Sequence, residues 1–72
     1  MKLNNLDLNL LVVFNAIYTE GSLTKAGEIV GITQPAVSSA LSKLRDYFDD
    51  QLFMRVGQGV QPTAKTENII IH

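Results

Sequence analysis

Residues 22–48 contain two amphipathic helical patterns that meet across one turn containing a glycine. Apolar side chains recur at helical intervals on both sides of Gly31. The members of this recurrence are Ala26, Val30, Ile32, Val37, Ala40, Leu41, Leu44 and Phe48. Two short helices with this pattern can bury one shared seam. The segment therefore limits the chain to folds in which two helices pack across a tight turn.

Small residues and capping residues indicate how the two helices cross. Ala26 and Gly27 leave room for a steep, close crossing, which gives a reason for a glycine that costs about 1 kcal/mol in a helix interior. Gly31 falls where the first helix must end, and glycine readily adopts the left-handed conformation common at such ends. Thr33 can cap the second helix, and Pro35 falls in its first turn, where a missing amide proton costs little. These features together predict a helix-turn-helix.

The second helix, expected over about residues 34–48, has a polar face of mostly short, uncharged side chains. Its members are Gln34, Ser38, Ser39, Ser42, Lys43 and Arg45. Glutamine can pair with adenine through two hydrogen bonds, and serine hydroxyls can donate or accept, so this face suits the major groove of DNA. Taken alone, the face is equally typical of a solvated surface helix. The turn, the small residues and the cap favour the DNA interpretation.

A further helix is expected before this pair, from about Leu6 to Thr19. Asn4 or Asn5 could cap its start, and Ser22 is the expected cap of the helix that follows. The apolar stripe of this scaffold helix consists of Leu6, Leu10, Leu11, Phe14, Ile17 and Tyr18.

The pattern changes after the second helix of the pair. Asp49 and Asp50 are expected to end that helix as surface charges, and apolar runs on both sides of residues 57–59 predict a small hairpin, or wing, over 52–61. Thr63 can cap a last helix, although residues 69–71 could instead form an edge strand. The predicted fold class is mainly α: a winged helix-turn-helix with three helices, a two-stranded wing and the start of a linker helix.

Composition narrows the function. The 72 residues suit one small domain, they include no cysteine, and their only histidine is the terminal His72. No catalytic motif or metal-ligand spacing is visible, so we expect neither an enzyme nor a cofactor or metal site. The absence of cysteine and of a long apolar run favours a cytoplasmic protein without a membrane span.

The chain resembles the N-terminal DNA-binding domain of LysR-type transcriptional regulators over almost its whole length. The most specific segments are TQPAVS at 33–38, LSKLR at 41–45, and LFMR at 52–55 followed by a glycine-containing wing and PTA. The DLNLL opening and the GQGVQPTA ending are most similar to the branch that contains the leucine-operon and nodulation regulators.

The resemblance implies a DNA-binding domain over 1–62 and the start of a linker and dimerisation helix over 63–72, with the effector domain absent. Two subunits would then bind palindromic half-sites on double-stranded DNA. A small-molecule effector would act only through the absent domain. The base contacts implied are Gln34, Pro35, Ser38 and Ser39; the backbone contacts implied are Thr24, Thr33, Ser42, Lys43, Arg55 and Gln58.

Two features weaken the electrostatic part of this interpretation. Many relatives carry a basic residue where this chain has Ser39 and Gln58, and the formal net charge is -1. A monomer should therefore hold DNA weakly. Arg55 could form a salt bridge with Asp49 or Asp50 instead of contacting DNA. A winged helix that binds a protein partner without binding DNA is the alternative function.

Overall fold

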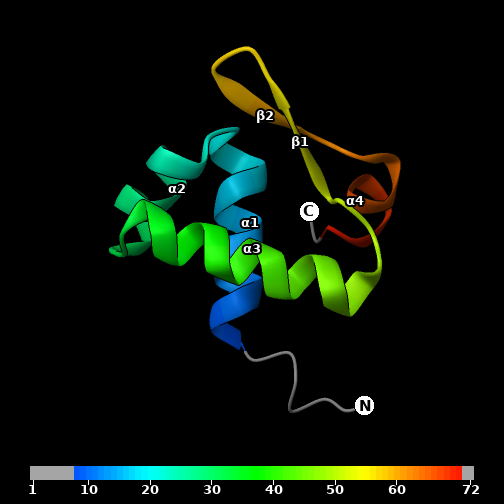
Figure 1. Ribbon diagram of the computed structural model, residues 1–72, viewed down its shortest axis with the longest axis horizontal. Coiled ribbons are helices and arrows are strands. Elements are labelled where there is room, and N and C mark those ends of the chain that lie inside the picture. The colour runs from blue at the N-terminus through cyan, green and yellow to red at the C-terminus, as the bar shows by residue number, and fades with distance from the viewer. Residues whose placement is uncertain (1–7, 71–72) are drawn as a thin grey trace.

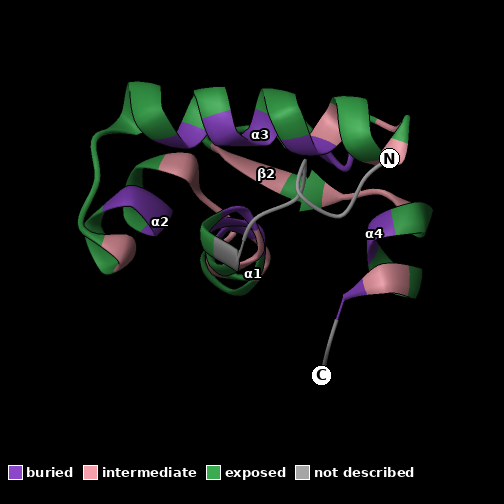
Figure 2. Ribbon diagram, turned by 90° about the horizontal axis from the view of Figure 1, so that it is seen from below, coloured by how far each residue is buried: buried purple, intermediate pink, exposed green. Residues whose placement is uncertain are grey.

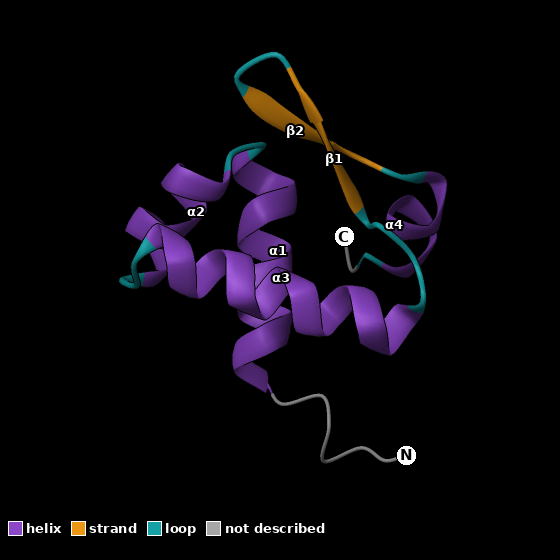
Figure 3. Ribbon diagram, in the orientation of Figure 1, coloured by secondary structure: helices purple, strands orange, loops and turns teal. Residues whose placement is uncertain are grey.

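The computed structural model describes residues 8–70, which form four helices and one hairpin (Figures 1 and 3). In chain order these are α1 (Leu8–Glu20), α2 (Leu23–Val30), α3 (Gln34–Phe48), β1 (Phe53–Val56), β2 (Gly59–Pro62) and α4 (Ala64–Ile69). Figures 1 and 2 show α1 crossing beneath α3, with α2 near the start of α3 and α4 near its end. The predicted winged helix-turn-helix is confirmed.

The scaffold helix α1 covers the helix pair as expected. It ends at Glu20, one residue later than predicted, while the expected start at Leu6 and the expected caps Asn4 and Asn5 lie outside the described residues. Of the predicted stripe, Leu10, Phe14 and Ile17 are buried, whereas Leu11 and Tyr18 are half-buried. Val13 is also buried, although the predicted stripe did not include it. The Tyr18 hydroxyl donates to Glu67 Oε1 at 2.7 Å and so ties α1 to α4.

Local capping bonds set the limits of α2 and α3. Ser22 Oγ accepts from the Lys25 N–H at 3.2 Å, and Thr33 Oγ1 accepts from the Ala36 N–H at 3.3 Å. Gly31 has φ +89° and ends α2 in the left-handed region. The two caps and the glycine turn were all predicted from the sequence, and the structure confirms them.

The core lies between α1 and the inner face of α3, and it extends to the start of the wing. Its buried members are Leu10, Val13, Phe14, Ile17, Ala26, Val37, Ala40, Leu41, Leu44, Leu52, Phe53 and Ile70. Ile32 was expected in the shared seam, but its side chain is 37% exposed. It follows Gly31 in the turn, where the helical periodicity no longer holds, so that assignment was wrong.

The wing is an antiparallel hairpin in which Val56 pairs with Gly59. This register leaves Gly57 and Gln58 as a two-residue turn, and Gly57 supplies the positive φ of +59° that such a turn requires. The hairpin docks on the turn between α1 and α2, where the Val60 N–H donates to the carbonyl of Gly21 at 3.0 Å. The strands span 53–62, one residue beyond the predicted 52–61.

The last helix begins where it was expected. Thr63 Oγ1 accepts from the Thr66 N–H at 3.3 Å and caps α4. Ile69 is helical and Ile70 is buried with an extended backbone outside any strand, so the edge-strand alternative is wrong for these two residues. Residue 71 lies outside the described residues. Within 8–70, none of the helices has the length and apolar character needed to cross a membrane.

Candidate nucleic-acid interface

The outer face of α3 is polar and open to solvent. Figure 2 shows the buried residues of α3 on the side toward α1 and its exposed residues on the opposite side. The six residues of α3 that were predicted to contact DNA are all exposed: Gln34, Pro35, Ser38, Ser39, Ser42 and Lys43. Arg45, the other member of the predicted polar face, is half-buried. Because Val37, Ala40 and Leu41 fill the core from the same helix, the outer face is held rigidly in place.

A narrow hollow joins the start of α2, the start of α3 and the wing. It is lined by Ser22, Leu23, Thr24, Gln34, Arg55, Gln58, Gly59 and Val60. Four predicted contact residues from three separate elements, namely Thr24, Gln34, Arg55 and Gln58, therefore meet at one place. We call it the α2–α3–wing hollow.

A second depression, the α3–wing groove, lies beside the first. It is lined by Leu23, Ser38, Leu41, Arg45, Phe53, Arg55 and Val60. Arg55 lines both depressions, the first together with Gln34 and the second together with Ser38. A cation at such a position is of the kind that contacts phosphates or enters a narrow groove of DNA.

The remaining predicted residues lie apart from these two depressions. Pro35, Ser39, Ser42 and Lys43 line neither, and they occupy the outer face of α3. The hydroxyl oxygen of Thr33 accepts the capping bond of α3, which leaves its proton available to donate to a phosphate.

Comparison with known proteins is consistent with this geometry. Residues 8–67 match the family of bacterial regulatory helix-turn-helix proteins of the lysR type. The chain belongs to the LysR family. The match covers α1 to α4 almost completely, so this chain is a LysR-family helix-turn-helix DNA-binding domain.

Two curated relatives support the finer placement inferred from the sequence. The transcriptional regulator LeuO of Escherichia coli K12 is 48% identical over 64 residues, which are 89% of this chain and 20% of that protein. Nodulation protein D 2 of Bradyrhizobium elkanii is 46% identical over 69 residues, 96% of this chain and 21% of that protein. The chain therefore spans about a fifth of the length of these relatives.

Two solved structures have the same fold. The probable transcriptional regulator PA0477 of Pseudomonas aeruginosa has a TM-score of 0.87 and 43% identity, covering 93% of this chain and 22% of that one. The DNA-binding domain of BenM was solved in complex with benA site 1 DNA. It has a TM-score of 0.83 and 29% identity, and the match covers 90% of this chain and 73% of that one.

Arg45 of this LysR-family domain has a role that the sequence did not reveal. It is half-buried, its Nε donates to the carbonyl of Gln51 at 2.6 Å, and its Nη2 donates to the carbonyl of Phe53 at 2.8 Å. The sequence placed it only on the polar face of the helix expected over residues 34–48. The partners are main-chain carbonyls, which every residue carries, so no sequence pattern pointed to them.

Asp50 is a correction to the expected pair of surface charges. Its Oδ2 accepts from the Leu52 N–H and from the Thr63 hydroxyl, both at 2.8 Å. The Leu52 N–H bond and then the Thr63 bond hold the pKa of Asp50 below its usual value. Asp49, by contrast, is exposed and ends α3 with φ +55°. The carboxylate of Asp50 thus serves the fold at the base of the wing.

Proposed function

We propose that this domain reads operator DNA by placing α3 in the major groove and the wing beside an adjoining minor groove. The observation that carries the proposal is the α2–α3–wing hollow, where Gln34 of the exposed helix face meets Arg55 and Gln58 of the wing. One continuous surface can therefore present amide, hydroxyl and guanidinium groups to bases and phosphates together. The BenM domain, which shares the fold, was solved bound to DNA.

The proposed roles follow from position. Gln34, Pro35, Ser38 and Ser39 are proposed to contact bases, because they are exposed on the first half of α3. Thr24, Thr33, Ser42, Lys43, Arg55 and Gln58 are proposed to contact the DNA backbone. Of these, Gln34 is the residue best placed for direct readout, since its amide can form two bonds to one adenine.

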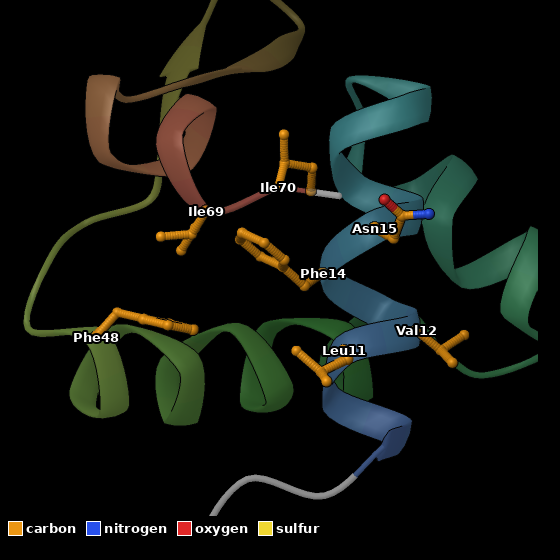
Figure 4. A pocket seen from close by; sticks show the side chains of 7 residues that line it. All are labelled: Leu11, Val12, Phe14, Asn15, Phe48, Ile69 and Ile70. Atoms are coloured by element: carbon orange, nitrogen blue, oxygen red, sulfur yellow. The ribbon is translucent and has the colours of Figure 1, made fainter. Parts of the chain in front are cut away.

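We further propose that two copies bind adjacent palindromic half-sites and associate through the helix that starts near Thr63. An apolar hollow beside α4 supports this, because Phe14, Phe48 and Ile69 converge there and leave apolar surface open to a partner (Figure 4). We propose that a small-molecule effector acts only through a domain outside these residues. Because its target is chromosomal DNA, the cytoplasm is the proposed location and catalysis is not part of the proposed role.

The test is DNA binding by two variants from the same helix. Gln34→Ala should relax base preference at one position of the site by about 1–3 kcal/mol, because a bidentate contact is lost. Lys43→Ala should weaken binding to all sequences and reduce the salt dependence, because a phosphate contact is lost. Selection from random duplexes measures the first effect, and fluorescence anisotropy over a series of salt concentrations measures the second.

Asp49→Ala serves as a control, because it lies past the end of α3 and has no proposed DNA contact. The proposal fails if a covalently linked dimer of the chain enriches no palindromic or repeated half-site in the selection. Saturable binding to a protein partner by the same dimer, without DNA binding, would favour the protein-interaction alternative.

A further inference from the structure

The wing leaves α3 through a tight turn centred on Leu52. The Phe53 N–H donates to the carbonyl of Gln51, only two residues earlier, at 2.7 Å, and Leu52 has φ +68°. A leucine with positive φ is an outlier, and three-residue turns with positive φ are strained. Such a conformation persists only where the surrounding groups hold it. The direction of β1 therefore depends on the groups that bind this turn.

Arg45 binds the turn on both sides of Leu52. Its Nε and Nη2 reach the carbonyls of Gln51 and Phe53, at 2.6 Å and 2.8 Å. A guanidinium can span two such acceptors because its donors form a rigid planar fork, whereas a lysine ammonium is a single point charge. The structure thus joins the last turn of the proposed recognition helix directly to the first strand of the wing.

We infer that Arg45 is a positioning residue for DNA reading, which fixes the direction of β1 and thereby holds Arg55 beside Ser38. Arg55 follows Phe53 by two residues, so the two side chains lie on the same face of β1. Phe53 is fully buried, and together with Ser38, Arg45 and Arg55 it lines the α3–wing groove. A rotation at the turn would move the Arg55 guanidinium relative to α3. The inference rests on the proposed function, in which Arg55 contacts the DNA backbone.

A direct phosphate contact by Arg45 is the competing explanation. Arg45 is half-buried and two of its nitrogens already donate to carbonyls. The two explanations differ in their tolerance of lysine, which keeps the charge and loses the fork. A phosphate contact would survive Arg45→Lys, whereas the positioning role would not.

The experiment is a double-mutant cycle on the affinity of the 72-residue chain for a short DNA duplex at low salt. Amide NMR shifts recorded during titration with the duplex measure that affinity. Arg45→Lys should weaken binding by about fivefold in the wild-type background and have little effect in the Arg55→Gln background, because the two residues then act through one contact. The matched control pairs Lys43→Gln with Arg55→Gln. Those two losses should multiply, since Lys43 has no bond to the wing.

Three outcomes overturn the inference. Arg45→Lys could bind like the wild type, it could lose affinity equally in both Arg55 backgrounds, or Arg55→Gln could bind like the wild type and leave nothing to position. The first two leave the proposed function standing if Gln34→Ala and Lys43→Ala behave as stated above. If instead neither of those variants changes DNA binding, the proposed function itself fails.

A measurement on the wild-type chain covers the case in which Arg45→Lys does not fold. The Nε–H signal of Arg45 should exchange slowly with water in the free protein and keep its shift when the duplex is added, because its acceptor is the carbonyl of Gln51 in both states. A signal that becomes protected only on adding the duplex would show a DNA contact and overturn the inference.

Discussion

At the scale of single residues, Gly27 sets how closely α2 approaches the turn and the start of α3. A Cβ at this position would lie 2.8 Å from the carbonyl oxygen of Ile32 and 3.2 Å from Cγ2 of Val37. The first of these atoms belongs to the backbone of the turn, which cannot shift without moving α3. The absence of a side chain at one position therefore fixes the placement of the helix proposed to read DNA.

Gly27→Ala should accordingly destabilise the domain despite the higher helix propensity of alanine. We expect a loss of about 1–3 kcal/mol in the free energy of unfolding, because overpacking against backbone outweighs a propensity gain of about 1 kcal/mol. Urea denaturation followed by far-UV circular dichroism measures it.

Gly31→Asn is the matched control for this substitution. A Cβ at Gly31 meets nothing within 4 Å, and asparagine tolerates the left-handed region, so we expect the smaller loss. A Gly27→Ala variant as stable as the wild type would show that the turn can move away from α2.

Single residues also differ in whether their structural roles can be predicted from the sequence. Ser22, Thr33 and Gly31 were predictable because a cap or a left-handed ending depends on neighbours three or four positions away in the chain. The positive φ of Leu52 and the two bonds of Arg45 were not. Both depend on how α3 and the wing lie against each other. Leucine rarely adopts a positive φ, so its presence in the sequence does not predict one.

At the scale of elements, the end of α3, the start of the wing and the start of α4 meet at one junction. The carbonyl of Leu52 accepts from the Thr63 N–H at 2.9 Å and from the hydroxyl of the fully buried Thr66 at 2.6 Å. Asp50 completes the junction by binding Leu52 and Thr63. The order and type of these elements could be predicted from periodicity and turn residues. The hydrogen bonds between them could not, because they join residues 50 and 52 to residues 63 and 66, which are distant in the sequence.

This junction should make the stability of the domain sensitive to acid. The pKa of Asp50 is lower in the folded state than in the unfolded chain, so the ionised carboxylate stabilises the fold. That contribution is present above the usual pKa of 3.8 and is lost as the pH falls below it, through the lowered folded-state value. Asp50→Asn should remove this part of the acid dependence, as measured by the midpoint of urea unfolding at a series of pH values between about 2 and 6.

Asp49→Asn is the natural comparison, because it removes the adjacent carboxylate and keeps Asp50 together with its two partners. The stability of the Asp49→Asn variant should therefore still fall at low pH by the amount that Asp50 contributes. An Asp50→Asn profile that overlays the wild-type profile would show that the junction does not depend on the charge.

At the scale of the whole molecule, the small number of basic groups limits how DNA can be held. The chain has six lysines and arginines against seven acidic residues, and the junction of α3 with the wing uses one of the six, Arg45. Lys43 and Arg55 remain exposed on the proposed reading surface. The domain organisation over 1–62 and 63–72 and the pairing of two subunits stay predictions.

Ser42→Arg tests whether the outer face of α3 meets the DNA backbone, because Ser42 is an exposed residue with a proposed backbone contact. An added cation there should form one more phosphate contact, raise affinity at low salt roughly threefold to tenfold, and steepen the dependence of log K on log salt by about 0.9. Thr19→Arg adds the same charge at an exposed position of α1, in a hollow that no residue of α3 or the wing lines, and should change affinity and slope much less. Fluorescence anisotropy with one duplex at several salt concentrations compares the two variants. Equal effects from both positions would mean that the charge acts through the overall field, and that α3 does not face the duplex.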